Sequence, residues 1–139
     1  MLATRISFIN EMAKLCEKVG ADIGEVRQGI ASDPRIGPDF LYAGLGYGGS
    51  CLPKDTRAIV SLAKKCGTSL KVIEASCEVN DEQKKWFWNK ICNYFGGEEK
   101  LADKTIAIWG IAFKANTDDL RSSPGLYFIE CLKNAKATV

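Results

Sequence analysis

The sequence predicts a mainly α-helical protein, in which a helical domain precedes the first β-α elements of a truncated Rossmann-like α/β domain. Residues 1–97 contain four segments with the apolar spacing of amphipathic helices. Residues 98–139 hold a short apolar run, a loop and another helical pattern, which is the order that opens a βαβ unit. We therefore place the domain boundary between residues 97 and 98.

The first helix is predicted over residues 2–20, because apolar side chains recur there at spacings of four and three. These side chains are Leu2, Ile6, Ile9, Ala13 and Cys16. Met12 and Val19 widen the apolar stripe, and Gly20 ends the helix. No N-cap or loop precedes the pattern, so we expect natural sequence to be missing upstream of Met1.

A second helix is predicted through Ile30, with Asp22 as its N-cap. Residues 32–50 contain two prolines and five glycines and match no regular element. A segment of this length inside a compact protein is usually functional or disordered. Four aromatic or apolar side chains favour the ordered, functional interpretation. They are Phe40, Leu41, Tyr42 and Tyr47.

Two more helices are predicted over residues 53–66 and 70–95, the first of which ends at Gly67. The longer one carries aromatic and apolar residues on or near its buried face: Trp86, Phe87, Ile91, Tyr94 and Phe95. Gly96-Gly97 and the charged residues 98–100 end the pattern.

The last part of the chain has a different character. Residues 104–109 are typical of a short buried strand, which Gly110 ends. Pro124 then opens a helix through Leu132, and residues 135–139 resemble the start of another strand.

Composition argues against several kinds of partner and compartment. The net charge of +2 gives no reason to expect a nucleic acid. The longest apolar run, Ile106–Phe113, is interrupted by Gly110 and is too short to cross a bilayer, so no membrane association is expected. The N-terminus lacks the basic and apolar regions of a secretory signal, which makes the cytoplasm the expected compartment.

The chain has six cysteines and no histidine. No pair of cysteines has metal-binding spacing, so no metal site is expected. Without histidine, a general base must be Asp, Glu, Lys, Tyr or a thiolate. Five cysteines lie in helical or apolar patterns typical of small core residues, and only Cys51 lies in a Gly/Pro-rich segment.

Residues 44–57 carry the main functional signal. Gly44-x-Gly46-x-x-Gly49 formally matches the dinucleotide fingerprint, but no strand of adequate length precedes it. We therefore interpret it as a ligand loop other than a Rossmann cofactor site, with a flexible connector as the alternative. Pro53 suits the first turn of a helix, which places Cys51 at the helix N-terminus.

A helix N-terminus with Lys54 and Arg57 nearby favours the thiolate form of Cys51. Asp55, four residues on, can face the same site, where a nucleophile and a water-positioning carboxylate suit covalent carbonyl chemistry. Compensation of the helix dipole is the alternative role of Asp55.

The loop before the last helix holds Lys114 and Arg121, which could bind phosphate oxygens. The alternative is a solvated loop that contains an Asp–Arg pair.

Three motifs together resemble the UDP-glucose 6-dehydrogenase family of nucleotide-sugar dehydrogenases. They are Arg35-Ile-Gly-Pro-Asp-Phe40, Gly46-Tyr-Gly-Gly-Ser-Cys51-Leu-Pro-Lys-Asp55 and Ala112-Phe-Lys-Ala-Asn-Thr-Asp-Asp-Leu-Arg121-Ser-Ser-Pro124. The resemblance covers the central helical domain and the start of the UDP-binding domain. It implies an NAD-dependent oxidation of the C6 alcohol of UDP-glucose to UDP-glucuronate, through a cysteine thiohemiacetal and thioester.

The resemblance also implies roles for individual residues. Cys51 is the nucleophile and Asp55 the carboxylate that assists the water steps, while Cys51, Lys54 and Arg121 contact NAD. The substrate-binding residues are Arg35, which serves the adjacent subunit, and Tyr42, Ala43, Gly44, Leu45, Gly46, Tyr47, Gly48, Phe113 and Lys114. The first long helix is expected to form the core of a homodimer.

The family's N-terminal Rossmann domain and its catalytic lysine and asparagine have no counterpart in these residues. We therefore expect that this chain neither binds NAD tightly nor turns over alone. GDP-mannose is an alternative substrate, whereas Ser50 in place of a histidine argues against N-acetylated sugars. A non-catalytic dimerisation module remains a second hypothesis. A thiol-redox protein is disfavoured because no resolving cysteine lies near Cys51.

Overall fold

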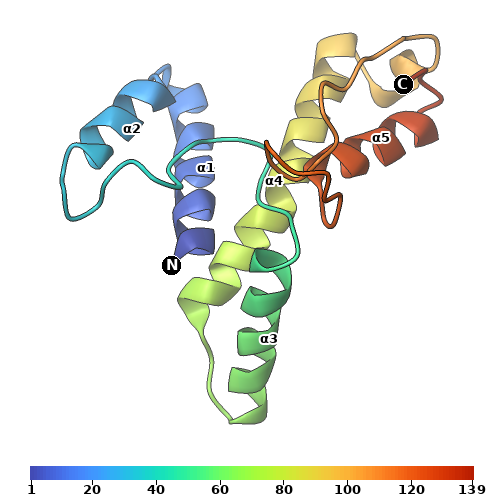
Figure 1. The fold of residues 1–139 in the computed structure, drawn as a ribbon. Coiled ribbons are helices and arrows are strands. Elements are labelled where there is room, and N and C mark those ends of the chain that lie inside the picture. The colour runs from blue at the N-terminus through green and yellow to red at the C-terminus, as the bar shows by residue number, and fades with distance from the viewer.

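The structure is a computed structural model that describes residues 1–139, and it consists of helices around one long central helix, α4 (Figure 1). The helices in chain order are α1 (Leu2–Val19), α2 (Ile23–Ala31), α3 (Leu52–Lys65), α4 (Lys71–Phe95), the 3-10 helix η1 (Glu98–Leu101) and α5 (Pro124–Asn134). The predicted mainly helical fold class is confirmed. None of these helices combines the length and apolar composition needed to cross a bilayer.

Helix α4 contacts α1, α3, η1 and α5, and so joins all parts of the chain. In Figure 1, α1 and α2 form one arm, α3 runs back along the start of α4, and the far half of α4 carries α5. Residues 40–51 cross from the first arm to the N-terminal end of α3. This crossing segment contains the predicted ligand loop.

The helices begin and end close to the predicted residues because their caps are local. Gly20 adopts the left-handed conformation that ends α1, and the Asp22 carboxylate accepts a 2.6 Å hydrogen bond from Gly24 N–H at the start of α2. Gly96 ends α4 in the same left-handed way. At α5, the Ser123 hydroxyl accepts a hydrogen bond from Gly125 N–H, so Ser123 is the N-cap and the helix begins at the predicted Pro124.

The buried faces differ from those predicted in two helices. In α1, Ile9 and Cys16 are buried as expected, but the polar residues Ser7 and Asn10 are buried beside them. In α4, Tyr94 is 85% exposed, so its predicted place on the apolar face is wrong. The buried aromatic residue is Trp88, which is 8% exposed and belongs to the core cluster.

The C-terminal part has a small core formed by Trp88, Leu101, Phe128 and Leu132. The buried strand predicted at residues 104–109 is wrong. The segment forms only one parallel bridge, between Thr105 and Thr138. This bridge involves residues 135–139, where the start of another strand was predicted, but no full strand forms there. Trp109 is fully exposed, because a single bridge between two extended segments cannot bury their side chains as a multi-stranded sheet does.

Candidate functional site

Three buried amide side chains hold the backbone of the predicted ligand loop. Asn10 of α1 accepts a 2.7 Å hydrogen bond from Gly44 N–H, and Gln83 of α4 donates a 2.8 Å bond to Gly44 O. Asn80 accepts a 2.7 Å bond from Tyr47 N–H and donates a 3.2 Å bond to Tyr47 O. The loop is therefore ordered by α1 and α4, which supports the prediction of an ordered segment at residues 32–50.

The loop glycines serve mainly to let the chain contact itself. A Cβ atom on Gly46 would lie 2.7 Å from Asn80 Oδ1, and one on Gly49 would lie 2.7 Å from the Phe113 ring. A Cβ on Gly48 would collide with the carbonyl oxygen of Ser122. Only Gly44 faces open space. At the other three glycines, the space that a side chain would need is taken by protein atoms, and the approach of a ligand to this backbone stays a prediction.

The C-terminal loop docks on the ligand loop. Gly49 N–H donates a 2.7 Å hydrogen bond to Arg121 O, and Phe113 N–H donates a 3.0 Å bond to Asp119 O within the C-terminal loop. The Phe113 side chain then covers Gly48 and Gly49. Two of the three motifs, which are far apart in sequence, therefore form one surface.

Cys51 lies at the end of this surface as the N-cap of α3. Its side chain is exposed, and its sulfur lies within hydrogen-bond distance of the Ser50 hydroxyl, at 3.6 Å. No side chain caps α3, so the first N–H groups of the helix stay open beside the thiol. The predicted placement of Cys51 at a helix N-terminus is confirmed.

The predicted carboxylate Asp55 lies on the first turn of α3 and pairs with Lys54 at 2.8 Å. Both side chains are more than half exposed. Hydrogen bonding to Asp55 raises the pKa of Lys54. No hydrogen bond joins the Asp55 carboxylate to Cys51; the two share only the backbone bond from Asp55 N–H to Cys51 O.

The predicted phosphate ligand Arg121 forms a forked pair with Asp119, with N–O distances of 2.8 to 3.1 Å. The guanidinium lowers the pKa of Asp119 to about 2. The solvated Asp–Arg pair, which the sequence left open, is thus present, and Nη1 of Arg121 has no protein partner. Lys114, the other cation of this loop, lies 5.5 Å from the ring centroid of its neighbour Phe113.

An apolar pocket of about 490 Å³ opens beside the loop. Leu45, Gly46 and Phe113 line it together with Phe87 of α4 and the exposed Trp109. The lining contains no charged group, so the pocket suits a flat or apolar part of a ligand, whereas the cations lie outside it.

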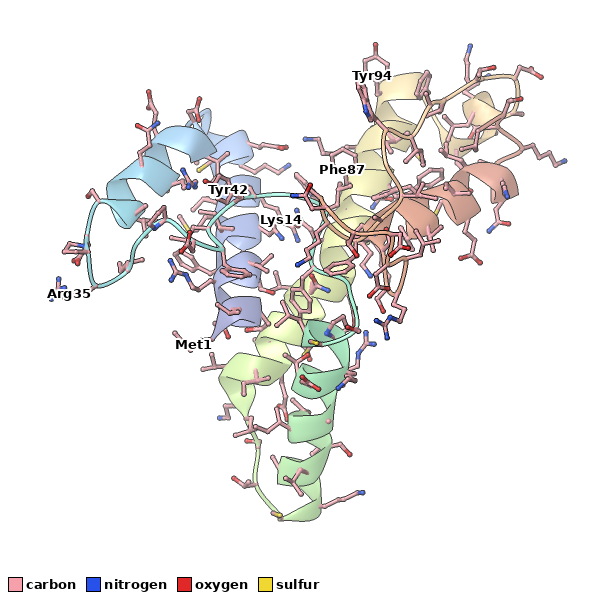
Figure 2. All side chains as sticks on the ribbon, in the orientation of Figure 1. Met1, Lys14, Arg35, Tyr42, Phe87 and Tyr94 are labelled. Carbon is pink, nitrogen blue, oxygen red and sulfur yellow. The ribbon has the colours of Figure 1, made fainter.

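Three predicted site residues lie away from this surface. Arg35 is at the tip of the 32–39 loop, far from the ligand loop, and pairs with Asp33 (Figure 2). Tyr42 is exposed and stacks 3.7 Å from the Arg27 guanidinium of α2. Ala43 is exposed between the two regions. Within one chain, therefore, Arg35 and Tyr42 do not join Cys51.

Sequence reasoning missed Asn10, Asn80 and Gln83. The signal available in the sequence was weak: Asn10 follows Ile9 within the apolar stripe of the first helix. Asn80 and Gln83 fall in a stretch of α4 rich in polar residues, which reads as solvent-exposed.

Comparison with known sequences decides the family. The sequence profile of the UDP-glucose/GDP-mannose dehydrogenase family, central domain, matches residues 1–82, and that of the family's UDP binding domain matches residues 107–139. The chain belongs to the UDP-glucose/GDP-mannose dehydrogenase family. The expected resemblance is confirmed, while the exact boundary at residues 97 and 98 stays a prediction.

Members of this family are similar to the chain over nearly its whole length. It is 46% identical to UDP-glucose 6-dehydrogenase TuaD of Bacillus subtilis over 99% of the chain, and 46% identical to a UDP-glucose 6-dehydrogenase of Rhizobium meliloti. A UDP-glucose dehydrogenase structure from Pyrobaculum islandicum is 35% identical, with a TM-score of 0.91 over 98% of the chain. The chain spans 29%, 31% and 31% of the length of these three relatives.

Proposed function

We propose that the chain is the central part of an NAD-dependent UDP-glucose 6-dehydrogenase, with Cys51 as the nucleophile. The observation that carries the proposal is the convergence of the ligand loop, the C-terminal loop and the α3 N-terminus on one surface, with an exposed thiol at its end. Two of the three family motifs contribute to this surface: one supplies the loop and the thiol, and the other supplies the covering Phe113.

In the proposed reaction, the C6 alcohol is first oxidised to an aldehyde. The Cys51 sulfur then attacks the aldehyde carbon to form a C–S bond, and the carbonyl oxygen takes a proton, which gives a thiohemiacetal. After a second oxidation the carbon is a thioester. Water, assisted by Asp55, adds to that carbon, the C–S bond breaks, and Cys51 leaves as a thiolate while the carboxylate forms. Two molecules of NAD+, bound one after the other, would each accept one hydride.

Few residues of this chain fit NAD. Two of the three glycines of the Gly44–Gly49 pattern are packed against protein atoms and no strand precedes the pattern, so it does not fit a dinucleotide fingerprint. Lys54 and Arg121 could hold the cofactor's phosphates from one side, beside Cys51. We propose that residues 1–139 alone neither bind NAD tightly nor turn over.

We further propose a UDP-sugar as the substrate and a homodimer as the assembly. Gly44, Leu45, Gly46, Tyr47, Gly48, Phe113 and Lys114 would surround the sugar and its phosphates, with Tyr42 and Ala43 at the outer edge. Helix α1 exposes a stripe of apolar residues at spacings of four, three and four. They are Phe8, Met12, Leu15 and Val19. Arg35, 87% exposed, is free to reach the substrate site of a partner.

Protection of Cys51 tests the proposal. UDP-glucose should slow alkylation of Cys51 by iodoacetamide in the 139-residue chain while leaving Cys66, at the other end of α3, unchanged. Titration with NAD should show no micromolar affinity. Labelling of Cys51 that saturating UDP-glucose leaves unaltered would contradict the substrate. Stronger protection by GDP-mannose would favour the alternative substrate.

A further inference from the structure

Asn80 lies in the middle of α4 and is 4% exposed. Its side-chain amide pairs with both backbone groups of Tyr47, which is how a neighbouring strand would pair with that residue. Tyr47 belongs to no helix or strand, so no regular element satisfies these groups. A buried backbone group without a hydrogen-bond partner is unfavourable, so Asn80 decides where Tyr47 can lie.

Gln83 extends this arrangement by one turn of the same helix. It is 2% exposed, and its Nε2 donates to Gly44 O. Residues three apart on a helix share a face, so one side of α4 presents two amides to a single short segment, Gly44–Tyr47. The loop is thereby held at both ends.

Gly46, between these two anchors, is matched to Asn80. Its φ of +100° is unfavourable for any residue with a Cβ, and an added Cβ would lie 2.7 Å from Asn80 Oδ1. Leu45 and Gly46 in turn form a wall of the apolar pocket. The position of that wall, and of the chain that leads on to Cys51, thus depends on the Asn80 amide.

We infer that Asn80, assisted by Gln83, is a positioning residue that preforms the Gly44–Tyr47 loop for a nucleotide sugar. The identity of the ligand rests on the proposed function, whereas the preformed loop rests on the hydrogen bonds alone. Preformed loops bind more tightly because less conformational entropy is lost on binding.

The test compares three variants of the 139-residue chain. N80L removes both hydrogen bonds at similar volume, and N80D exchanges the amide for a carboxyl group. N89L is the matched control, because Asn89 is an exposed asparagine of the same helix. The measurements are the exchange rate of the Tyr47 amide proton by NMR, the affinity for UDP-glucose, and the urea midpoint.

In N80L, we expect exchange of the Tyr47 amide to rise and UDP-glucose affinity to fall by about tenfold or more each, because both hydrogen bonds to Tyr47 are lost. N89L should match the wild type. A purely structural role would lower the urea midpoint while the affinity of the folded chain stayed unchanged. Unchanged Tyr47 exchange or unchanged affinity in N80L would overturn the inference.

N80D adds a readout that stays informative should N80L fail to fold. A protonated carboxyl group can accept from Tyr47 N–H and donate to Tyr47 O, whereas a carboxylate can only accept. Burial favours the protonated form, so N80D should bind like the wild type at pH 5 and about tenfold more weakly at pH 8. If the ratio of N80D affinity to wild-type affinity were the same at pH 5 and pH 8, the inference would be contradicted.

The affinity of the wild-type chain at the same two pH values is the control for titration of other groups around Asn80. These are Tyr47, Arg57, Asp81, Lys84, Tyr127 and Glu130. A wild-type chain that does not bind UDP-glucose would contradict the ligand of the proposed function, and Tyr47 exchange in N80L and N80D would still decide whether Asn80 positions the loop.

Discussion

The backbone N–H of Gly49 donates a 2.7 Å hydrogen bond to the carbonyl oxygen of Arg121. This bond joins the ligand loop to the segment that matches the UDP binding domain. Because Gly48 and Gly49 have no side chains, the two backbones approach closely enough for Phe113 to lie across them. The site is thus assembled from both parts of the chain.

Replacing Gly48 by alanine should separate these two segments. The added Cβ would collide with Ser122 O, which is a backbone atom and cannot rotate away. We expect a loss of about 1–3 kcal/mol in the free energy of unfolding, measured by urea denaturation.

Gly44→Ala is the control for this substitution, because nothing lies within 4 Å of its Cβ position. Its stability should stay within about 0.5 kcal/mol of the wild type, while its affinity for UDP-glucose should fall. A G48A chain as stable as G44A would contradict the close packing.

The two exposed cysteines of α3 should differ in reactivity. Cys51 is at the N-terminus of the helix and Cys66 at its C-terminus. The helix dipole stabilises negative charge on sulfur only at the first position, so iodoacetamide should label Cys51 about two to five times faster at pH 7. Mass spectrometry of the labelled peptides measures both rates in one sample.

Arg121→Ala provides the second arm of this measurement. The hydrogen bonds to Asp119 are the main cause of the raised pKa of the Arg121 guanidinium, and electrostatic attraction to Cys51 adds to it. Removing this charge should slow labelling of Cys51 and leave Cys66 unchanged. Equal labelling of the two cysteines in the wild type would rule out an activated Cys51.

Tyr47 should be the last tyrosine to ionise. Burial raises the pKa of its phenol to about 12 from the ordinary value of 10.0. The folded state therefore holds a proton that the unfolded state loses, so stability is full below pH 10 and falls as the pH rises toward 12. Absorbance at alkaline pH measures the titration of the four tyrosines.

Tyr47→Phe should remove both the late titration step and the corresponding part of the stability loss above pH 10. Tyr42→Phe is the comparison, since Tyr42 is exposed. A late step that persists in Y47F would assign it to another tyrosine.

The apolar stripe on α1 predicts self-association. Leu15 is 53% exposed in the middle of the stripe, and a glutamate there would place a charge in the proposed dimer core. Leu15→Glu should convert a dimer to a monomer in analytical ultracentrifugation. Lys18→Gln, an exposed site off the stripe with the same change in charge, should leave the dimer intact. A wild-type chain that stays monomeric at all concentrations would exclude this dimer.

Local chemistry made much of the fold predictable. Gly20, Asp22 and Gly96 act on the backbone within a few residues, so the helix ends followed from the sequence. Which face of α4 is exposed could not be predicted, because burial depends on partners that are distant in sequence. Trp88 is buried by Leu101 and the residues of α5, whereas Tyr94 projects beyond them (Figure 2).

The parts of the site that lie in one continuous stretch of sequence were predictable, whereas contacts between residues distant in sequence were not. Cys51 and the α3 N-terminus lie in one stretch of sequence, and their relation was predicted correctly. The pairing of Asn80 with Tyr47 joins residues 33 positions apart through backbone groups, which leave no trace in side-chain pattern. The packing of the loop glycines was unpredictable for the same reason. Glycine is required at residues 46, 48 and 49 because Asn80, Ser122 and Phe113, which are distant in sequence, lie against them.

Helix α4 runs without interruption for 25 residues, roughly 37 Å. Its first half holds the ligand loop through Asn80 and Gln83, and its second half supports Phe128 and Leu132 through Trp88. One continuous helix thus spans both parts of the chain, with no break in the helix between them. Because the helix is continuous, we expect the ligand loop and the C-terminal core to move together if a ligand shifts either end.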